Sequence, residues 1–401
     1  MNYDNVAEPS LRVVADTDAK QVAATSRTAP GIGYVPALDG LRGAAVLAVM
    51  VGHALGPGTS YFAGPSVGVD VFFVLSGFLI TFLLVREYDQ GQQRIIFRNF
   101  YARRVLRLAP ALFGMLIAIT LVGWVLFTRE RAESTTTDAF IALLYAANWA
   151  RAFDIHPPVL FGHAWSLSTE EQFYLLWPIV LWSLLRNVRS RLNVVMAISA
   201  GAIACWLWRV TLLFEGASIN RLYNGLDTRG DCLLVGCALG MLLASNLIKE
   251  EARPVIAGWL RRIAPVAGAL FLWVLVFGDW SAAYMYYWLF AVIEVLATAI
   301  ILQIFVAPTS ATRSLLSWRP LVWVGTISYG LYLWHYPVYR LSREFGVSFD
   351  QAVPHIRVVI ATAATFLAAT VSYYMLERPI LRLKRYFGPA SSETPSTHRR
   401  R

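Results

Sequence analysis

The chain has 401 residues, of which 57% are hydrophobic and only 15% are charged. A soluble domain carries about 25% charged residues, so this composition excludes an ordinary soluble fold and predicts an all-α, polytopic membrane protein. A net charge of +10 would suit nucleic-acid binding in a soluble chain. In a membrane protein it is explained by arginine-rich cytoplasmic loops, so we expect no nucleic-acid partner. The three cysteines lie in apolar runs, typical of small core residues, and recognised metal-ligand spacings are missing, so we expect no metal.

Residues 1–33 are polar and lack the apolar stretch of a signal peptide, which predicts a disordered cytoplasmic tail before a membrane domain at 34–385. A bundle of about ten transmembrane helices follows. We expect these helices at residues 37–57, 67–86, 108–128, 171–187, 193–214, 230–248, 263–279, 283–306, 321–339 and 356–377. Residues 386–401 form a basic tail. Because the arginine-rich turns fall on one side, both tails are expected in the cytoplasm of a multi-pass cell-membrane protein.

The segment 129–170 leaves the helix count open. Residues 138–149 are apolar but short for a crossing, and the rest of the segment is polar and contains proline. We expect an outside loop with a short or re-entrant helix. A full crossing would raise the count to eleven.

The first apolar helix, PALDGLRGAAVLAVMVGHALGP, carries Asp39, Arg42 and His53. Arg42 and His53 are eleven residues apart, which places them on one face and about 16 Å apart along the axis. Ionisable side chains are costly in hydrocarbon, so this face is expected to point into the protein and to mark a site. A neutral imidazole can accept a proton there. Arg42 alone is explained equally well by snorkelling to the interface.

The run RRVLR places Arg103, Arg104 and Arg107 on one helical flank. Guanidinium groups bind phosphate oxygens bidentately, so the run is a candidate clamp for a nucleotide-bearing cofactor such as coenzyme A. Contacts with anionic lipid headgroups are the alternative.

A second dense motif, HAWSLSTEEQFYLLWP, brings His163, Glu170 and Tyr174 to one membrane entrance. We expect a helix that begins at Glu170 and is capped by Ser168 or Thr169. The Glu170 carboxylate then faces the bundle, where it can orient His53 or bind a hydroxylated acceptor.

Further polar residues interrupt apolar segments and are candidates for substrate binding or structural support: Asp70, Ser76, Arg229, Asp231, Ser328, Tyr329 and His335. Each also has a simpler explanation. Ser76 can be a small packing residue, Asp70 can be interfacial, and Arg229 with its neighbouring aspartates can be an internally neutralised cluster.

These motifs together resemble the acyltransferase 3 family of integral-membrane O-acyltransferases. The resemblance extends over about residues 34–385 and rests on LDGLRG with His53 downstream, GVDVFFVLSGFLIT, FYARRVLRLAPA, HAWSLSTEEQFYLLWP, DTRGDCLLVG and ISYGLYLWHYPV. It implies a ten-helix enzyme that takes an acyl group, commonly acetyl from acetyl-CoA on the cytoplasmic side. The acceptor it implies is a hydroxyl of a sugar, glycolipid, cell-wall glycan or small natural product.

The resemblance also implies roles for individual residues. The essential His–Arg pair of the family matches His53 and Arg42, its RxxR motif matches Arg104 and Arg107, and its glutamate before the Phe–Tyr pair matches Glu170. Direct transfer and an acyl-enzyme intermediate both stay open. The alternative function is transport of an anionic or glycosylated solute along the intramembrane charges.

Overall fold

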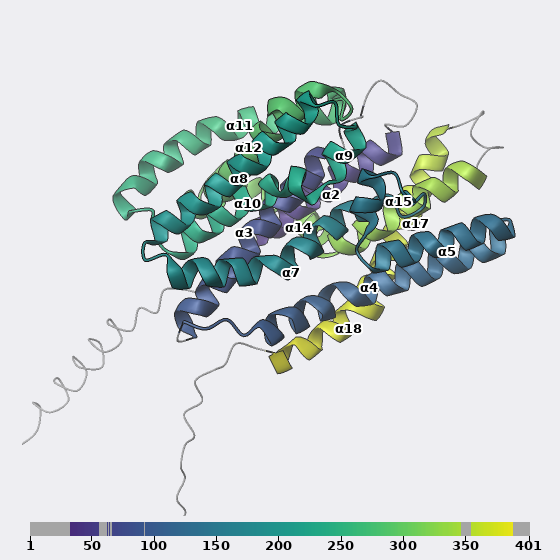
Figure 1. The fold of residues 1–401 in the computed structure, drawn as a ribbon, viewed down its shortest axis with the longest axis horizontal. Helices are drawn as coiled ribbons and strands as arrows, with labels where there is room; N and C mark the ends of the chain where they lie inside the picture. The colour runs from purple at the N-terminus through teal and green to yellow at the C-terminus, as the bar shows by residue number, and fades with distance from the viewer. Residues whose placement is uncertain are drawn as a thin grey trace, which may run out of the picture. The chain divides into compact units, whose positions relative to one another are not determined.

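The computed structural model describes residues 33–55, 62, 64, 66–91, 93–345 and 354–387, so both predicted tails lie almost wholly outside the described residues. The described chain is helical and contains no strand (Figure 1). Its α-helices are α2 (Pro36–Leu55), α3 (Ser66–Gln90), α4 (Phe97–Leu126), α5 (Arg129–Leu143), α6 (Ala147–Ala152), α7 (Ala164–Asn187), α8 (Arg191–Phe214), α9 (Ile219–Asn224), α10 (Leu226–Ala244), α11 (Arg253–Phe277), α12 (Phe290–Val306), α13 (Ala311–Leu316), α14 (Arg319–Thr326), α15 (Ser328–Phe345), α17 (Pro354–Ser372) and α18 (Arg378–Leu381). Short 3-10 or π segments are η1 (Glu250–Ala252), η2 (Met285–Leu289), η3 (Tyr373–Glu377) and η4 (Arg382–Phe387).

Seven stretches of the described helices are long and apolar enough to cross a membrane, which confirms an all-α, polytopic membrane protein. They are Pro36–Leu55, Val67–Gln90, Phe97–Leu126, Arg191–Phe214, Glu250–Phe277, Met285–Val306 and Ile356–Leu381. The other three predicted spans correspond to α7, α10 and α15, which carry several charged residues each. A count of ten stays a prediction.

Helix α4 begins earlier than the sequence indicated. Arg103, Arg104 and Arg107 belong to its first three turns rather than to a loop before residue 108. Helix α4 ends at Leu126, and α5 begins at Arg129 after a two-residue connection. Most of the segment that was expected to be an outside loop is therefore helical. Helix α7 begins at Ala164 rather than at Glu170. The predicted caps are wrong, because Ser168 and Thr169 lie inside the helix and donate to carbonyls four residues earlier.

The predicted ninth span is interrupted. Ile327 leaves the helical conformation, so α14 ends at Thr326 and α15 begins anew at Ser328. Helix α14 packs closely along α2. A Cβ at Gly325 would overlap the Asp39 carbonyl oxygen, so only glycine allows this approach. Because the helix begins anew at Ser328, α15 can turn its polar residues toward α2.

Helix α3 lies in the middle of the fold and contacts α2, α7, α10 and α12 (Figure 1). Its closest partner is α10, where a Cβ at Gly77 would overlap the Leu233 carbonyl oxygen. Small residues allow such backbone contact between membrane helices. Helix α3 therefore forms a fixed wall beside which α2, α7 and α15 present their side chains.

The segment before α7 is anchored to α5 by Asp138, which is 2% exposed. One carboxylate oxygen lies 2.9 Å from His156 Nε2, and the other accepts a hydrogen bond of 2.8 Å from the Val159 backbone N–H. Burial raises the pKa of the Asp138 carboxyl above its ordinary value, although these hydrogen bonds oppose the shift. This anchor fixes the approach of the chain to His163.

Candidate functional site

A cavity of about 290 Å³, which we name the arginine cavity, lies between α2, α3, α4, α7 and α15. Most of the predicted site residues line it, namely Arg42, Ser76, Arg103, Arg104, Arg107, Glu170, Tyr174, Ser328 and Tyr329. These five helices pack their apolar faces against other parts of the bundle, and they bring these polar side chains together in the arginine cavity.

Four arginines and two carboxylates, those of Glu87 and Glu170, line the arginine cavity. Arg103 is paired with Glu87 at 2.9 Å, and Arg104 is paired with Glu171 at 3.5 Å. Arg104 also lies 3.4 Å from the centre of the Tyr174 ring, and its buried Nε has no hydrogen-bond partner among the described residues. Several partly buried guanidinium groups close together can bind an anionic ligand with several oxygen atoms.

Arg42 completes this basic group from the first helix. It lies 3.4 Å from the Asp39 carboxylate on the preceding turn of α2, and it is within Coulombic range of Arg107 on α4. The predicted flank of the RRVLR run therefore faces Arg42 across the cavity. This juxtaposition of two distant segments could not be deduced from either motif alone.

A second cavity, of about 370 Å³, lies toward the other end of α2, and we name it the histidine cavity. His53, His163, Tyr332 and Tyr336 line it, together with Trp165, Tyr223, Trp280 and the arginines Arg151, Arg340 and Arg343. Val69 and Tyr332 line both cavities, so the two spaces share a wall. The Tyr332 hydroxyl is held in that wall by hydrogen bonds to Ser166 Oγ, at 2.5 Å, and to the His163 carbonyl, at 3.0 Å.

A chain of hydrogen bonds fixes the tautomer of His53. His335 Nδ1 lies 3.1 Å from the Leu331 carbonyl oxygen, which can only accept, so Nδ1 carries the proton. In a neutral ring His335 Nε2 is then an acceptor, and its partner at 3.2 Å is His53 Nδ1. His53 Nδ1 therefore donates, and the lone pair of neutral His53 lies on Nε2. Such a tautomer is the one that a general base requires.

His163 forms the third member of this group. It is 2% exposed, and neither of its ring nitrogens has a hydrogen-bond partner among the described residues. Its ring centre lies 5.5 Å from that of His335 and 5.1 Å from that of Tyr336. The sequence indicated His163 and His335 as supporting residues, but it did not indicate that they meet His53. A signal was present, since three of only six histidines fall in apolar segments.

Glu170 lies in the arginine cavity, whereas the ring partner of His53 is His335. The carboxylate that was expected to orient His53 therefore belongs with Arg42 and Arg104 instead. The end of α2 is fixed separately, because Arg343 donates a hydrogen bond to the His53 carbonyl oxygen.

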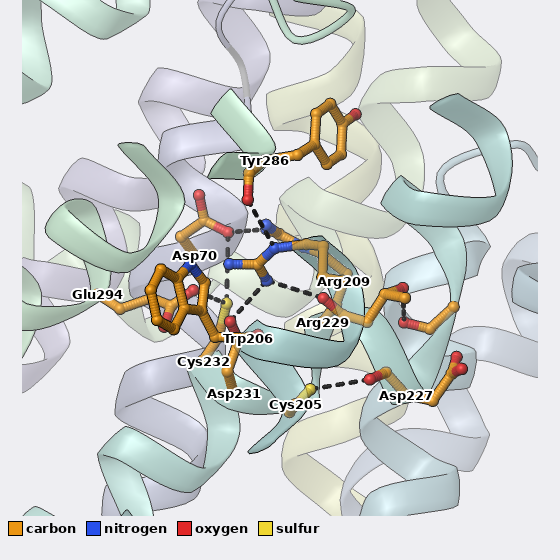
Figure 2. Close-up of polar contacts among 12 residues, drawn as sticks. Asp70, Cys205, Trp206, Arg209, Asp227, Arg229, Asp231, Cys232, Tyr286 and Glu294 are labelled. Atoms are coloured by element: carbon orange, nitrogen blue, oxygen red, sulfur yellow. Dashed lines mark hydrogen bonds and ion pairs between the residues drawn. The ribbon is translucent and has the colours of Figure 1, made fainter. Parts of the chain in front are cut away.

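Asp70, Arg229 and Asp231 line neither cavity and belong to a buried ion network (Figure 2). Asp70 on α3 pairs with Arg229 on α10, and both side chains are fully buried in the protein rather than exposed at its surface. Asp231 pairs with Arg209 on α8 at 2.5 Å. Arg229 and Asp231 are thus neutralised by α3 and α8 rather than by one another.

Three groups of this network, Asp231, Cys232 and Glu294, have ligand atoms within 4.8 Å of one another, a spacing that can hold a metal ion. Arg209 already engages Asp231, and the Cys232 thiol lies 2.9 Å from a Glu294 carboxylate oxygen (Figure 2). Arg209 and the Cys232–Glu294 contact thus engage these three groups within the protein, while neither Asp231 carboxylate oxygen meets the criteria for a hydrogen bond among the described residues. All three cysteines are free.

Comparison with known proteins gives one consistent result. The family model described as an acyltransferase domain, acyltransferase 3, matches residues 35–374. YrhL of Bacillus subtilis is 36% identical over 360 residues, and the peptidoglycan O-acetyltransferase OatA of Listeria monocytogenes is 33% identical over 360. The O-acetyltransferase OatA of Staphylococcus aureus is 35% identical over 363 residues.

Each of these alignments covers 86% of this chain but only 55–57% of the relative, so the chain spans little more than half the length of the curated relatives it matches. No solved structure matches the chain. The family match covers most of the chain, including both cavities. The chain therefore belongs to the acyltransferase 3 family.

Proposed function

We propose that the protein is a membrane O-acyltransferase that moves an acyl group, acetyl in the first instance, from acyl-CoA to a hydroxyl of a cell-wall glycan. The names of its relatives support the reaction and the acceptor. The four arginines that line the arginine cavity support a phosphate-bearing donor. Transport, the alternative that the sequence leaves open, gains no support from these relatives.

In this proposal the donor enters the arginine cavity, where Arg42, Arg104 and Arg107 bind its phosphates. The acceptor enters the histidine cavity. Because the arginine-rich turns of a membrane protein are cytoplasmic, the first cavity opens to the cytoplasm and the second lies toward the outside. The acyl group reaches the acceptor at the shared wall of Val69 and Tyr332.

The observation that carries the proposal is the hydrogen-bond chain from the Leu331 carbonyl through His335 to His53. His53 Nε2 takes the proton from the acceptor hydroxyl as its oxygen attacks the thioester carbonyl. A new C–O bond forms, the C–S bond breaks, and the proton passes from His53 to the leaving thiolate. His53 is the catalytic base, and His335 is a positioning residue.

The test is thiol release from acetyl-CoA by the purified full chain in detergent, with a cell-wall glycan fragment as acceptor and mass analysis of the product. We expect release to depend on the acceptor and to fall about 10²- to 10⁴-fold in His53→Ala. The matched control is Arg261→Gln, which removes an exposed charge from α11, far in sequence from both motifs. Equal turnover in His53→Ala and Arg261→Gln would refute the assignment of His53.

A further inference from the structure

The histidine cavity has a second chemical feature that the acyl-transfer mechanism does not use. Arg151 on α6 and Arg340 and Arg343 on α15 line it, and no carboxylate is among its described lining residues. Neither Arg151 nor Arg340 has a carboxylate within 4.0 Å in the described part of the chain. The positive charges of Arg151 and Arg340 therefore favour an anion in this cavity.

Arg340 binds the Tyr336 hydroxyl, and a guanidinium nitrogen of Arg151 lies near the same hydroxyl. Arg340 Nε and one terminal nitrogen lie 3.3 and 3.2 Å from Tyr336 Oη. A Cβ placed on Gly162 would lie 2.9 Å from Tyr336 Oη and 3.0 Å from a terminal nitrogen of Arg151, so these two atoms flank the same point. The Arg151 side chain is oriented by its Nε–H, which donates to Asn224 Oδ1 at 3.1 Å. Two guanidiniums and a hydroxyl thus form an open set of donors.

This set lies next to the histidines. The ring centre of Tyr336 lies 5.2 Å from that of His53 and 5.1 Å from that of His163. An anionic group bound at Tyr336 would therefore be within one sugar ring of the hydroxyl that His53 deprotonates. The anion and the reacting hydroxyl must belong to the same or to adjacent sugar units.

The histidine cavity is also lined by aromatic rings. Trp165, Tyr223 and Trp280 form a continuous row, with ring centres 4.6 Å apart for the first pair and 5.3 Å apart for the second. Aromatic side chains with polar edges provide rigid apolar contact area and can hydrogen-bond at the same time. A pyranose ring, with its apolar face and its rim of hydroxyls, fits such a row better than a fully apolar ligand does.

We propose that Arg151, Tyr336 and Arg340 form an anion subsite that makes the enzyme selective for acceptor saccharides bearing a carboxylate or a phosphate close to the acylated hydroxyl. The inference rests on the proposed function and deepens it, because it specifies the charge of the acceptor. The sugar ring lies against the aromatic row, the anion is bound at Tyr336, and the reacting hydroxyl faces His53. Arg151 and Arg340 are specificity residues and take no part in proton transfer.

The experiment compares three matched acceptors with the purified full chain and acetyl-CoA: a neutral oligosaccharide, its uronic acid analogue and its sugar-phosphate analogue. Charge-assisted hydrogen bonds predict that kcat/KM for an anionic acceptor exceeds that for the neutral one by about 10- to 100-fold. The uronic acid and sugar-phosphate arms distinguish a carboxylate from a phosphate. Equal use of all three acceptors by the wild-type enzyme would overturn the proposal, whatever the variants do.

Arg151→Gln and Arg340→Gln are expected to reduce the preference for the anionic acceptor to within about threefold, mainly through KM, while Arg261→Gln keeps it. The preference is a ratio measured within each variant, so a general loss of active protein cancels. A preference that survives in both glutamine variants would also overturn the proposal. If acetyl-CoA is not cleaved with any acceptor, the proposed function fails, and binding of fluorescent neutral and anionic oligosaccharides to the wild type still tests the subsite.

Discussion

Replacing His335 tests the hydrogen-bond chain most directly. In His335→Leu the Nδ1–H of His53 loses its acceptor at 3.2 Å, in a site where His335 is fully buried. A buried donor left without a partner costs about 1–3 kcal/mol, and the ring can escape this cost by adopting the other tautomer, which removes the lone pair from Nε2. At 1.36 kcal/mol per tenfold change, kcat should fall about 5- to 150-fold.

The matched variant is His335→Gln, whose side-chain oxygen can accept the same hydrogen bond. We expect it to retain several-fold more activity than His335→Leu, with both measured as thiol release from acetyl-CoA after folding has been checked by size-exclusion chromatography. Because the two histidines act as a unit, His53→Ala/His335→Leu should be no slower than His53→Ala alone, within about twofold. Wild-type turnover in His335→Leu, or additive losses in the double variant, would refute the assigned tautomer.

Three further predictions concern stability, each measured as the thermal unfolding midpoint in detergent. Gly325→Ala should lower the free energy of unfolding by about 1–3 kcal/mol or more, because the added Cβ meets the α2 backbone. The control is Gly268→Ala, whose Cβ would meet nothing within 4 Å and which should change the stability by less than about 1 kcal/mol. Equal effects of the two substitutions would contradict the packing argument. Asp70→Asn should lose about 3–5 kcal/mol because Arg229 is left buried and unpaired, and a neutral result would mean that Arg229 finds another partner. Because the pKa of Asp138 is raised in the folded protein, folding is favoured when the carboxyl is protonated. This stabilisation is fully present below the ordinary carboxyl pKa of 3.8 and is lost as the pH rises through the folded-state pKa. Wild type should therefore lose stability relative to Asp138→Asn over that rise, and a constant difference would contradict the shift.

The sequence predicted the helical class, and it indicated many of the residues that line the arginine cavity, because both depend on local patterns. Hydropathy identifies apolar helices, and helical periodicity places Arg104 and Arg107 on one flank. These patterns also made the shared face of Arg42 and His53 predictable, since both lie on one unbroken helix. What the periodicity could not give is that the two residues line different cavities.

Contacts between distant segments were not predictable in this way. His53 and His335 are 282 residues apart, and neither flanking motif carries information about the other. The break at Ile327 was missed for a related reason, because α14 and α15 join into one apolar run whose interruption is stabilised by tertiary contacts with α2. The caps expected at Ser168 and Thr169 failed because a serine or threonine can equally donate to a carbonyl inside a helix.

The pairing of Asp70 with Arg229 has a consequence for the biogenesis of the protein. The two residues are 159 positions apart, so at about 5–20 residues per second α10 leaves the ribosome about 8–30 s after α3. During that interval Asp70, which lies in the second turn of α3, has no Arg229 to neutralise it, and an ionised side chain in a membrane helix is unfavourable. Helix α3 is nevertheless strongly apolar, with a mean hydropathy of 2.3 over an 18-residue window, and this favours its insertion during that interval. Synthesis that stops before residue 229 would therefore leave an inserted helix whose acid has no ion-pair partner.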